Sequence, residues 1–119
     1  MKFLLDTSFL VNAVKFKIDI IFELTKFGKP EIYTIDLVVK ELERLAQGKS
    51  RDGSAAKVCL SLIKNAGIIK SSAKNADSGL ELLSKRFVVC TQDKELSDRI
   101  KSKGASVVMI RQKKYLVIL

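Results

Sequence analysis

Histidine is absent from the 119 residues. This excludes histidine acid-base catalysis and the usual zinc hydrolase ligand sets. Any metal chemistry would rest on oxygen ligands, which favour hard ions such as Mg²⁺ or Mn²⁺. The two cysteines, Cys59 and Cys90, lie among apolar residues without a second ligand at metal-binding spacing. We therefore expect both to be reduced core residues.

Long apolar runs and loop-forming residues are also scarce. No apolar run approaches the roughly 20 residues of a membrane span, and the chain enters an apparent strand without a signal-peptide cleavage site. We therefore expect a cytoplasmic protein that does not contact membranes. One proline and six glycines, with 47% hydrophobic residues, argue against disorder. The length suits one domain over residues 1–119.

Negative charge is in the minority. The chain has 22 Lys and Arg against 13 Asp and Glu, a formal net charge of +9. A polyanionic partner is the natural inference, with nucleic acid as the first candidate. A basic surface that serves only solubility is the simpler alternative.

Alternating strand and helix patterns run along the whole chain. Apolar runs predict strands over residues 2–5, 31–35, 68–71, 86–90 and 106–110. Helical spacing predicts helices after Asp6, over 18–27, from 36 to about 47, over 54–65, from about 75, and over 93–103. The apolar tail 115–119 is expected to pair at a sheet edge or to seal an interface. This alternation predicts an α/β fold, a three-layer α/β/α sandwich with a central, mainly parallel sheet.

Three local features carry further expectations. Thr34 or Asp36 is expected to cap the helix that follows the second strand. Residues 47–53 read as a polar loop. In the helix that opens near residue 75, the leucines are expected to face the core; these are Leu80, Leu82 and Leu83.

Four acidic residues stand where a sheet of this kind would bring them together. Asp6 closes the first strand and Asp93 follows the fourth, and carboxyl ends of parallel strands meet at one edge, where ligands bind. Asp77 lies in the first turn of a helix, and Glu41 lies on or beside an apolar helix face. Four neighbouring carboxylates would raise one another's pKa unless a cation neutralised them, so the cluster predicts metal. One or two Mg²⁺ or Mn²⁺ ions would suit phosphodiester hydrolysis.

Each carboxylate also has a structural interpretation. Asp6 and Asp93 could serve only as helix caps, and Asp77 could serve only to complement a helix dipole. Glu41 is the hardest to explain in this way, because a carboxylate near an apolar face needs a partner.

The chain resembles a PIN domain over essentially its whole length. The resemblance rests on four motifs in order and spacing: Leu4-Leu5-Asp6-Thr7-Ser8, Val39-Lys40-Glu41-Leu42, Ala76-Asp77-Ser78-Gly79-Leu80, and Val88-Val89-Cys90-Thr91-Gln92-Asp93. Within the family, the short middle region looks most like archaeal proteins of the small-subunit ribosomal RNA processing branch, with VapC-type toxins as a second home. One departure concerns Ser78, since processing-branch members often have a second Asp there, and the number of ions stays open.

The resemblance implies a metal-dependent endoribonuclease with Asp6, Glu41, Asp77 and Asp93 as the catalytic, metal-binding site. Hydroxyl groups would support that site, namely Thr7, Ser8 and Thr91. RNA would be the substrate. An antitoxin, a ribosome-assembly protein or a second copy of the chain are the protein partners that stay open.

Two alternatives remain. A PIN fold that binds RNA or protein without cutting would rely on its basic residues: Lys49, Arg51, Arg99, Lys101, Lys103, Arg111, Lys113 and Lys114. A phosphate-transfer receiver domain shares the α/β build, but it would need an acidic pair directly after the first strand.

Overall fold

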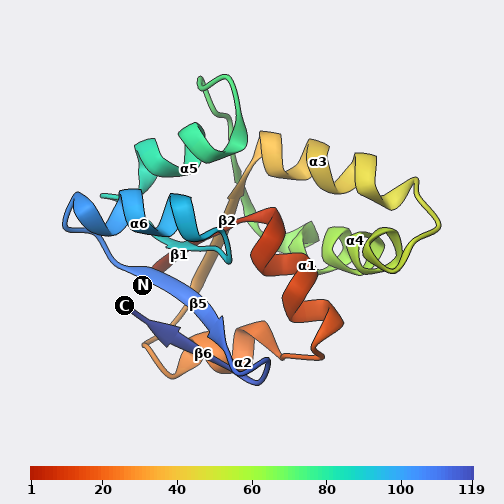
Figure 1. Ribbon diagram of the computed structural model, residues 1–119, viewed down its shortest axis with the longest axis horizontal. Coiled ribbons are helices and arrows are strands. Elements are labelled where there is room, and N and C mark those ends of the chain that lie inside the picture. The colour runs from red at the N-terminus through yellow and green to blue at the C-terminus, as the bar shows by residue number, and fades with distance from the viewer.

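A six-stranded sheet forms the centre of the protein, and the computed structural model describes all residues 1–119 (Figure 1). The strands are β1 (Lys2–Leu5), β2 (Glu31–Ile35), β3 (Gly67–Ile69), β4 (Val88–Cys90), β5 (Val107–Arg111) and β6 (Tyr115–Ile118). The helices are α1 (Thr7–Lys15), α2 (Ile20–Thr25), α3 (Asp36–Ala46), α4 (Arg51–Leu62), α5 (Ala76–Leu83) and α6 (Lys94–Ser102), with a 3₁₀ turn at Ile63–Asn65.

The strand order β3-β2-β1-β4-β5-β6 places β1 at the centre. All pairs are parallel except β5 and β6. The chain moves outward from β1 to β3 and then returns to β4 on the other side of β1. Right-handed crossovers therefore place α1 to α4 on one face and α5 and α6 on the other. The predicted three-layer α/β/α sandwich with a mainly parallel sheet is confirmed.

The central strand is buried because it has helices on both sides. Phe3 and Leu4 are 0% exposed and Leu5 is 2% exposed. A continuous apolar run of this kind is what a doubly covered parallel strand requires. Burying each such side chain stabilises the fold by about 1.5–3 kcal/mol. The strand that delivers Asp6 is therefore rigidly held.

The C-terminal tail pairs at the sheet edge, as one of the two predicted alternatives. β6 runs antiparallel to β5, with Arg111 opposite Tyr115 at the hairpin end. Cys59 and Cys90 are buried free thiols, as predicted. No helix combines the length and the apolar character that a membrane crossing requires.

The predicted cap of α3 is wrong. The N-cap is Ile35, which makes no side-chain cap bond. Thr34 is buried, and its hydroxyl donates instead to the Leu5 carbonyl at 2.7 Å. Asp36 is the first helical residue, and its carboxylate accepts from the backbone N–H groups of Leu37 at 3.0 Å and Ser71 at 2.9 Å. Thr34 therefore connects β2 to the end of β1, and Asp36 connects the start of α3 to the segment after β3.

The polar loop is shorter than predicted, because α4 begins at Arg51 within the expected loop 47–53. Ser50 caps the helix by accepting from Gly53 N at 3.2 Å. Gly53 allows the tight α3–α4 turn, since a Cβ there would lie 2.3 Å from the Gly48 carbonyl oxygen. The expected helix 54–65 therefore starts earlier and ends in the 3₁₀ turn.

Other boundaries shift by a few residues. The expected helix 18–27 is only α2, and the strands expected at 68–71, 86–90 and 106–110 are β3, β4 and β5 with displaced ends. Leu82 was predicted to face the core but is 68% exposed, whereas Leu80 is fully buried. Leu82 lies two residues, about 200°, around the helix from Leu80. Helical spacing favours only one of these two leucines for the core.

Candidate active site

Asp6 and Thr91 leave two neighbouring strands side by side at the switch point of the sheet. Leu5 pairs with Cys90, and the Asp6 N–H donates to the Cys90 carbonyl at 3.0 Å. The strand order reverses here, between β1 and β4, which is where ligands bind in open α/β sheets. Because β1 pairs directly with β4, Asp6 and the Thr91–Asp93 segment leave the sheet side by side.

The Asp6 carboxylate is buried, with the residue only 5% exposed, and three donors fix it. Oδ1 accepts from Thr7 N at 2.7 Å, and Oδ2 accepts from the hydroxyls of Thr91 at 2.6 Å and Ser8 at 3.2 Å. Burial raises the pKa of this carboxyl, the three hydrogen bonds lower it in part, and the charge of Asp77 raises it. Asp6 therefore has one orientation and an incompletely compensated charge.

Two hydroxyls connect Asp6 to the loop that carries Asp93. The Thr91 hydroxyl accepts from the Asp93 backbone N–H at 3.1 Å, and the Ser8 hydroxyl accepts from Gln92 N at 3.1 Å. Each hydroxyl also donates to Asp6 Oδ2. The positions of Asp6 and Asp93 are thus coupled through Ser8 and Thr91.

Gln92 fixes the same loop from the other side and was not singled out by sequence reasoning. Its Oε1 accepts from Ile110 N at 2.6 Å, and its Nε2 donates to the Ile110 carbonyl at 3.5 Å. The side-chain amide thereby pairs with β5 in the way that a strand residue would. Its position between Thr91 and Asp93 is the only sequence signal for this role.

Asp93 is the N-cap of α6. Its Oδ1 accepts from Leu96 N at 3.1 Å, while Oδ2 accepts no hydrogen bond within the protein. The interpretation of Asp93 as a helix cap is therefore correct for its Oδ1 atom. The other oxygen is available to a ligand.

Asp77 and Glu41 approach the site from two further helices, α5 and α3. Asp77 Oδ2 lies 3.9 Å from an Arg99 guanidinium nitrogen, and Glu41 Oε2 lies 3.9 Å from Arg44. Burial raises the pKa of Asp77, the charge of Asp93 raises it, and Arg99 lowers it. Glu41 is only half-buried, with 41% of its side chain exposed. Glu41 therefore lies beside the apolar face of α3 rather than on it.

These side chains line one open cavity of about 340 Å³, which we call the acidic cavity. Its carboxylates are Asp6, Glu41, Asp52, Asp77 and Asp93. Thr7 and Ser8 also line it, and the buried Thr7 hydroxyl has no hydrogen-bond partner. The four predicted carboxylates and two of the three predicted hydroxyl residues thus share one cavity. Thr91 does not line it and contacts it only through its hydrogen bond to Asp6.

The oxygen-bearing side chains of the acidic cavity are of the type that binds a hard divalent cation. Carboxylate and hydroxyl oxygens are the ligands of Mg²⁺ and Mn²⁺, and Thr7, which lines the cavity, has a buried hydroxyl without a hydrogen-bond partner. No group of three or more Asp, Glu or Cys side chains is placed to hold a metal ion together. Asp77 and Glu41 stand on separate helices, each within 4 Å of an arginine.

Sequence reasoning missed one ion pair at this cavity. Lys15 Nζ on α1 lies 2.8 Å from Asp52 Oδ1 on α4, and both residues line the acidic cavity. Asn12 lines it too and donates to the Ser8 carbonyl at 2.8 Å. Asn12 and Lys15 lie four and seven residues after Ser8, on the same face of a helix. A helical projection of the sequence would therefore have placed them beside Ser8.

The basic residues predicted to bind RNA are all exposed, but most lie away from this cavity. Arg99 is the exception, since it lines an adjoining hollow with Glu41 and Asp77. Its guanidinium also bonds Glu81 at 2.8 Å. The other basic residues of the set are distributed elsewhere on the surface: Lys49, Arg51, Lys101, Lys103, Arg111, Lys113 and Lys114.

Known proteins resemble the chain over nearly its full length. A family model described as a PIN like domain matches residues 3–113. The chain belongs to the PIN-like domain family. This PIN-like domain is 33% identical to Ribonuclease VapC4 of Methanocaldococcus jannaschii, covering 95% of the chain and 92% of that protein. It is 25% identical to Ribonuclease VapC9 of Archaeoglobus fulgidus, covering 95% and 85%.

Solved structures share the PIN-like fold. The PIN domain endonuclease Utp24 matches with a TM-score of 0.81 and 22% identity, covering 98% of this chain and 90% of that one. VapBC2 from Rickettsia felis, bound to a DNA fragment from its promoter, matches with a TM-score of 0.55 and 14% identity, covering 92% and 98%. At these identities the structures show the fold alone.

Proposed function

We propose that this PIN-like domain is an endoribonuclease that depends on Mg²⁺ or Mn²⁺ and hydrolyses RNA in the acidic cavity. One observation carries the proposal: Ser8 and Thr91 couple Asp6 to the Asp93 loop at the switch point, in the cavity that Glu41 and Asp77 also line. The names of its sequence relatives as ribonucleases support the same reaction.

In this proposal Asp6 and the free oxygen of Asp93 are the principal metal ligands. Asp77 serves a second or more weakly held ion, so the number of ions is one or two. When bound, a divalent cation would stabilise the phosphodiester oxygens and lower the pKa of an attacking water.

The chain's own groups orient the reaction. Glu41 is half-exposed and only loosely paired with Arg44, so it can accept a proton from water. The water oxygen bonds to phosphorus as the bond from phosphorus to the 3′ oxygen breaks. The 3′ oxygen takes up a proton from solvent, which leaves a 5′ phosphate and a 3′ hydroxyl. Thr91 and Ser8 keep Asp6 fixed during this step, because their hydroxyls contact it directly.

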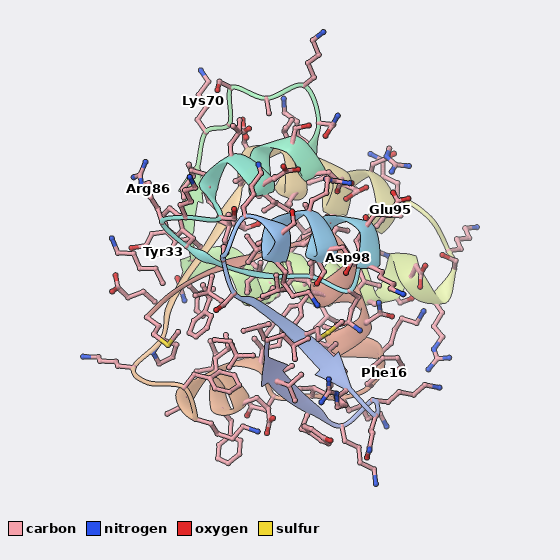
Figure 2. All side chains as sticks on the ribbon, turned by 60° about the vertical axis from the view of Figure 1, so that its left-hand side comes forward. Phe16, Tyr33, Lys70, Arg86, Glu95 and Asp98 are labelled. Atoms are coloured by element: carbon pink, nitrogen blue, oxygen red, sulfur yellow. The ribbon has the colours of Figure 1, made fainter.

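A cleavage assay tests the proposal. Labelled single-stranded RNA is incubated with the protein in Mn²⁺, in Mg²⁺ and in EDTA. Asp93→Asn should lower cleavage by more than about 100-fold, since loss of even an outer-shell partner of a metal typically reduces activity about 10–100-fold. Asparagine keeps the amide oxygen that caps α6, so folding should be retained. The matched control is Asp98→Asn on the exposed side of α6 (Figure 2).

Full activity of Asp93→Asn, or of the unsubstituted protein in excess EDTA, would contradict the proposal. The alternative is a binding module that does not cut, which the unclosed ligand arrangement favours. In that case Mg²⁺ would leave the melting temperature unchanged, because only a ligand that binds the folded state raises it.

Two cellular roles fit this activity. The relatives with the VapC name favour a toxin with an antitoxin partner, whereas the short α3–α4 connection favours ribosomal RNA processing with an assembly partner. The same acidic cavity serves RNA cleavage in both roles.

A further inference from the structure

A second cavity lies at the opposite end of the central strands and carries the opposite charge. Its volume is about 430 Å³, and its lining contains Lys2, Lys85, Arg86 and Lys103 but no Asp or Glu. We call it the basic hollow. Only Lys103 belongs to the basic residues that the sequence singled out. The other three are scattered along the sequence and converge only in the fold.

The basic hollow is built at the N-terminal ends of the two strands that form the active site. Lys2 begins β1, and Arg86 directly precedes the Phe87 that leads into β4. Parallel strands start at the same edge, so their first residues meet as their last residues do. α6 joins the two cavities, because it opens at Asp93 and its C-cap is Lys103.

One aromatic ring, that of Phe87, lies beside two of the cations. Phe87 is only 7% exposed. Lys2 Nζ lies 5.9 Å and the Arg86 guanidinium carbon 5.8 Å from its ring centroid, and Tyr33 packs edge-on against the ring at 5.1 Å. A cation within about 6 Å of an aromatic ring face is attracted to it. Arg86 extends from the edge of the molecule into solvent (Figure 2).

The positive charge of the basic hollow is largely uncompensated. Lys103 pairs with Glu81, but no carboxylate lies within 4.0 Å of Lys2, Lys85 or Arg86. Salt screens separated surface charges, so a scattered basic surface would bind little. Concave shape concentrates the potential of like charges and favours an anionic ligand.

A phosphodiester chain matches this arrangement. It offers anionic oxygens at regular intervals, and both the Arg fork and Lys point charges bind phosphate. β1 spans Lys2–Leu5, so about 10 Å of strand separates the two cavities. The basic hollow is therefore too far from the acidic cavity to contact the same phosphate.

We propose that the basic hollow binds the backbone of the substrate RNA at nucleotides outside the bond that is cut. This inference rests on the proposed function. It makes Lys2, Lys85 and Arg86 determinants of affinity for long RNA, without a part in the cleavage step. Arg99 and Lys103 lie about one helical turn apart, on α6 and at its C-cap, between the two cavities.

RNA binding by charge-neutralised variants tests the inference. The variant replaces Lys2, Lys85 and Arg86 with Gln, and the matched control replaces Lys57, Lys64 and Lys70, which are exposed and unpaired elsewhere. Both are made in the Asp93→Asn background, so that RNA stays intact in Mg²⁺. Fluorescence anisotropy is measured with single strands of about four and about 16 nucleotides, and melting temperatures check folding.

For the long strand, the slope of log affinity against log salt should fall by about 2, since each single-strand phosphate contact contributes about 0.7. Affinity at low salt should fall by at least about tenfold, because three contacts are lost. The short strand should bind both triple variants equally. Two results would overturn the inference and leave the proposed function intact. The first is an equal loss of long-strand affinity in the triple variant and in its control. The second is a loss of short-strand affinity in the triple variant as large as its loss of long-strand affinity. Failure of the unsubstituted protein to bind or cut RNA would overturn the proposed function as well.

Discussion

The two ends of β1 and β4 differ in charge and in how that charge is held. At the carboxyl ends, Asp6 is buried under three hydrogen bonds and its pKa is raised by burial. At the amino ends, Lys2 and Arg86 are exposed and rest on the ring of Phe87. A buried charge needs directed partners, whereas an exposed charge is stabilised by water. Substitutions at the acidic end should therefore affect folding and chemistry, and those at the basic end should affect binding alone.

The largest effect on folding is expected at the hydroxyls of the acidic end. Thr91→Val removes the donor to Asp6 and the acceptor for Asp93 N, so the free energy of unfolding should fall by about 1–3 kcal/mol. Thr91→Ser should restore most of it. Urea denaturation measures the difference.

Thr7→Val is the matched control for this substitution. The Thr7 hydroxyl is buried without a partner, so valine of the same shape should leave the free energy of unfolding unchanged or raise it, because a buried unsatisfied polar group is removed. Equal destabilisation by Thr91→Val and Thr7→Val would contradict the claim that the Thr91 hydroxyl stabilises the fold by coupling Asp6 to Asp93.

A smaller, pH-dependent effect is expected at Glu81, which lies between the two ends. Hydrogen bonds from Lys103 and Arg99 lower the pKa of this carboxyl. A lowered folded-state pKa stabilises the fold above the ordinary pKa of Glu, and this stability is lost as pH falls through the lowered value. Glu81→Gln should therefore melt slightly below the unsubstituted protein at pH 7, and the difference should vanish in acid. A difference in melting temperature that persists in acid would show that packing, and not the charge of Glu81, causes it.

The fold and the placement of the acidic residues could be predicted because each rests on a local pattern. Buried strands read as apolar runs, and Asp6 and Asp93 follow two of them directly. The Glu41 and Asp77 helices enter the same edge, as expected. The cap of α3 was missed because Thr34 and Asp36 bond to distant segments, as Asp36 does to Ser71. The start of α4 at Ser50 and the exposure of Leu82 have local signals in capping and helical spacing, and the prediction did not weigh them.

The rest of the site depends on side chains that meet only in the folded chain. Lys15 and Asp52 are 37 residues apart in sequence and contact across two helices. Gln92 reaches Ile110 over 18 residues. The basic hollow likewise gathers cations from both ends of the chain. No local periodicity marks such pairs, since they depend on strand order and helix packing.

Manganese binding by calorimetry tests the central claim most directly, that Asp6 and Asp93 form two halves of one metal site. The unsubstituted protein should bind Mn²⁺, Asp6→Asn and Asp93→Asn should each lose that binding, and the Lys2, Lys85 and Arg86 triple variant should keep it. Equal Mn²⁺ affinity in Asp6→Asn and the unsubstituted protein would contradict the claim.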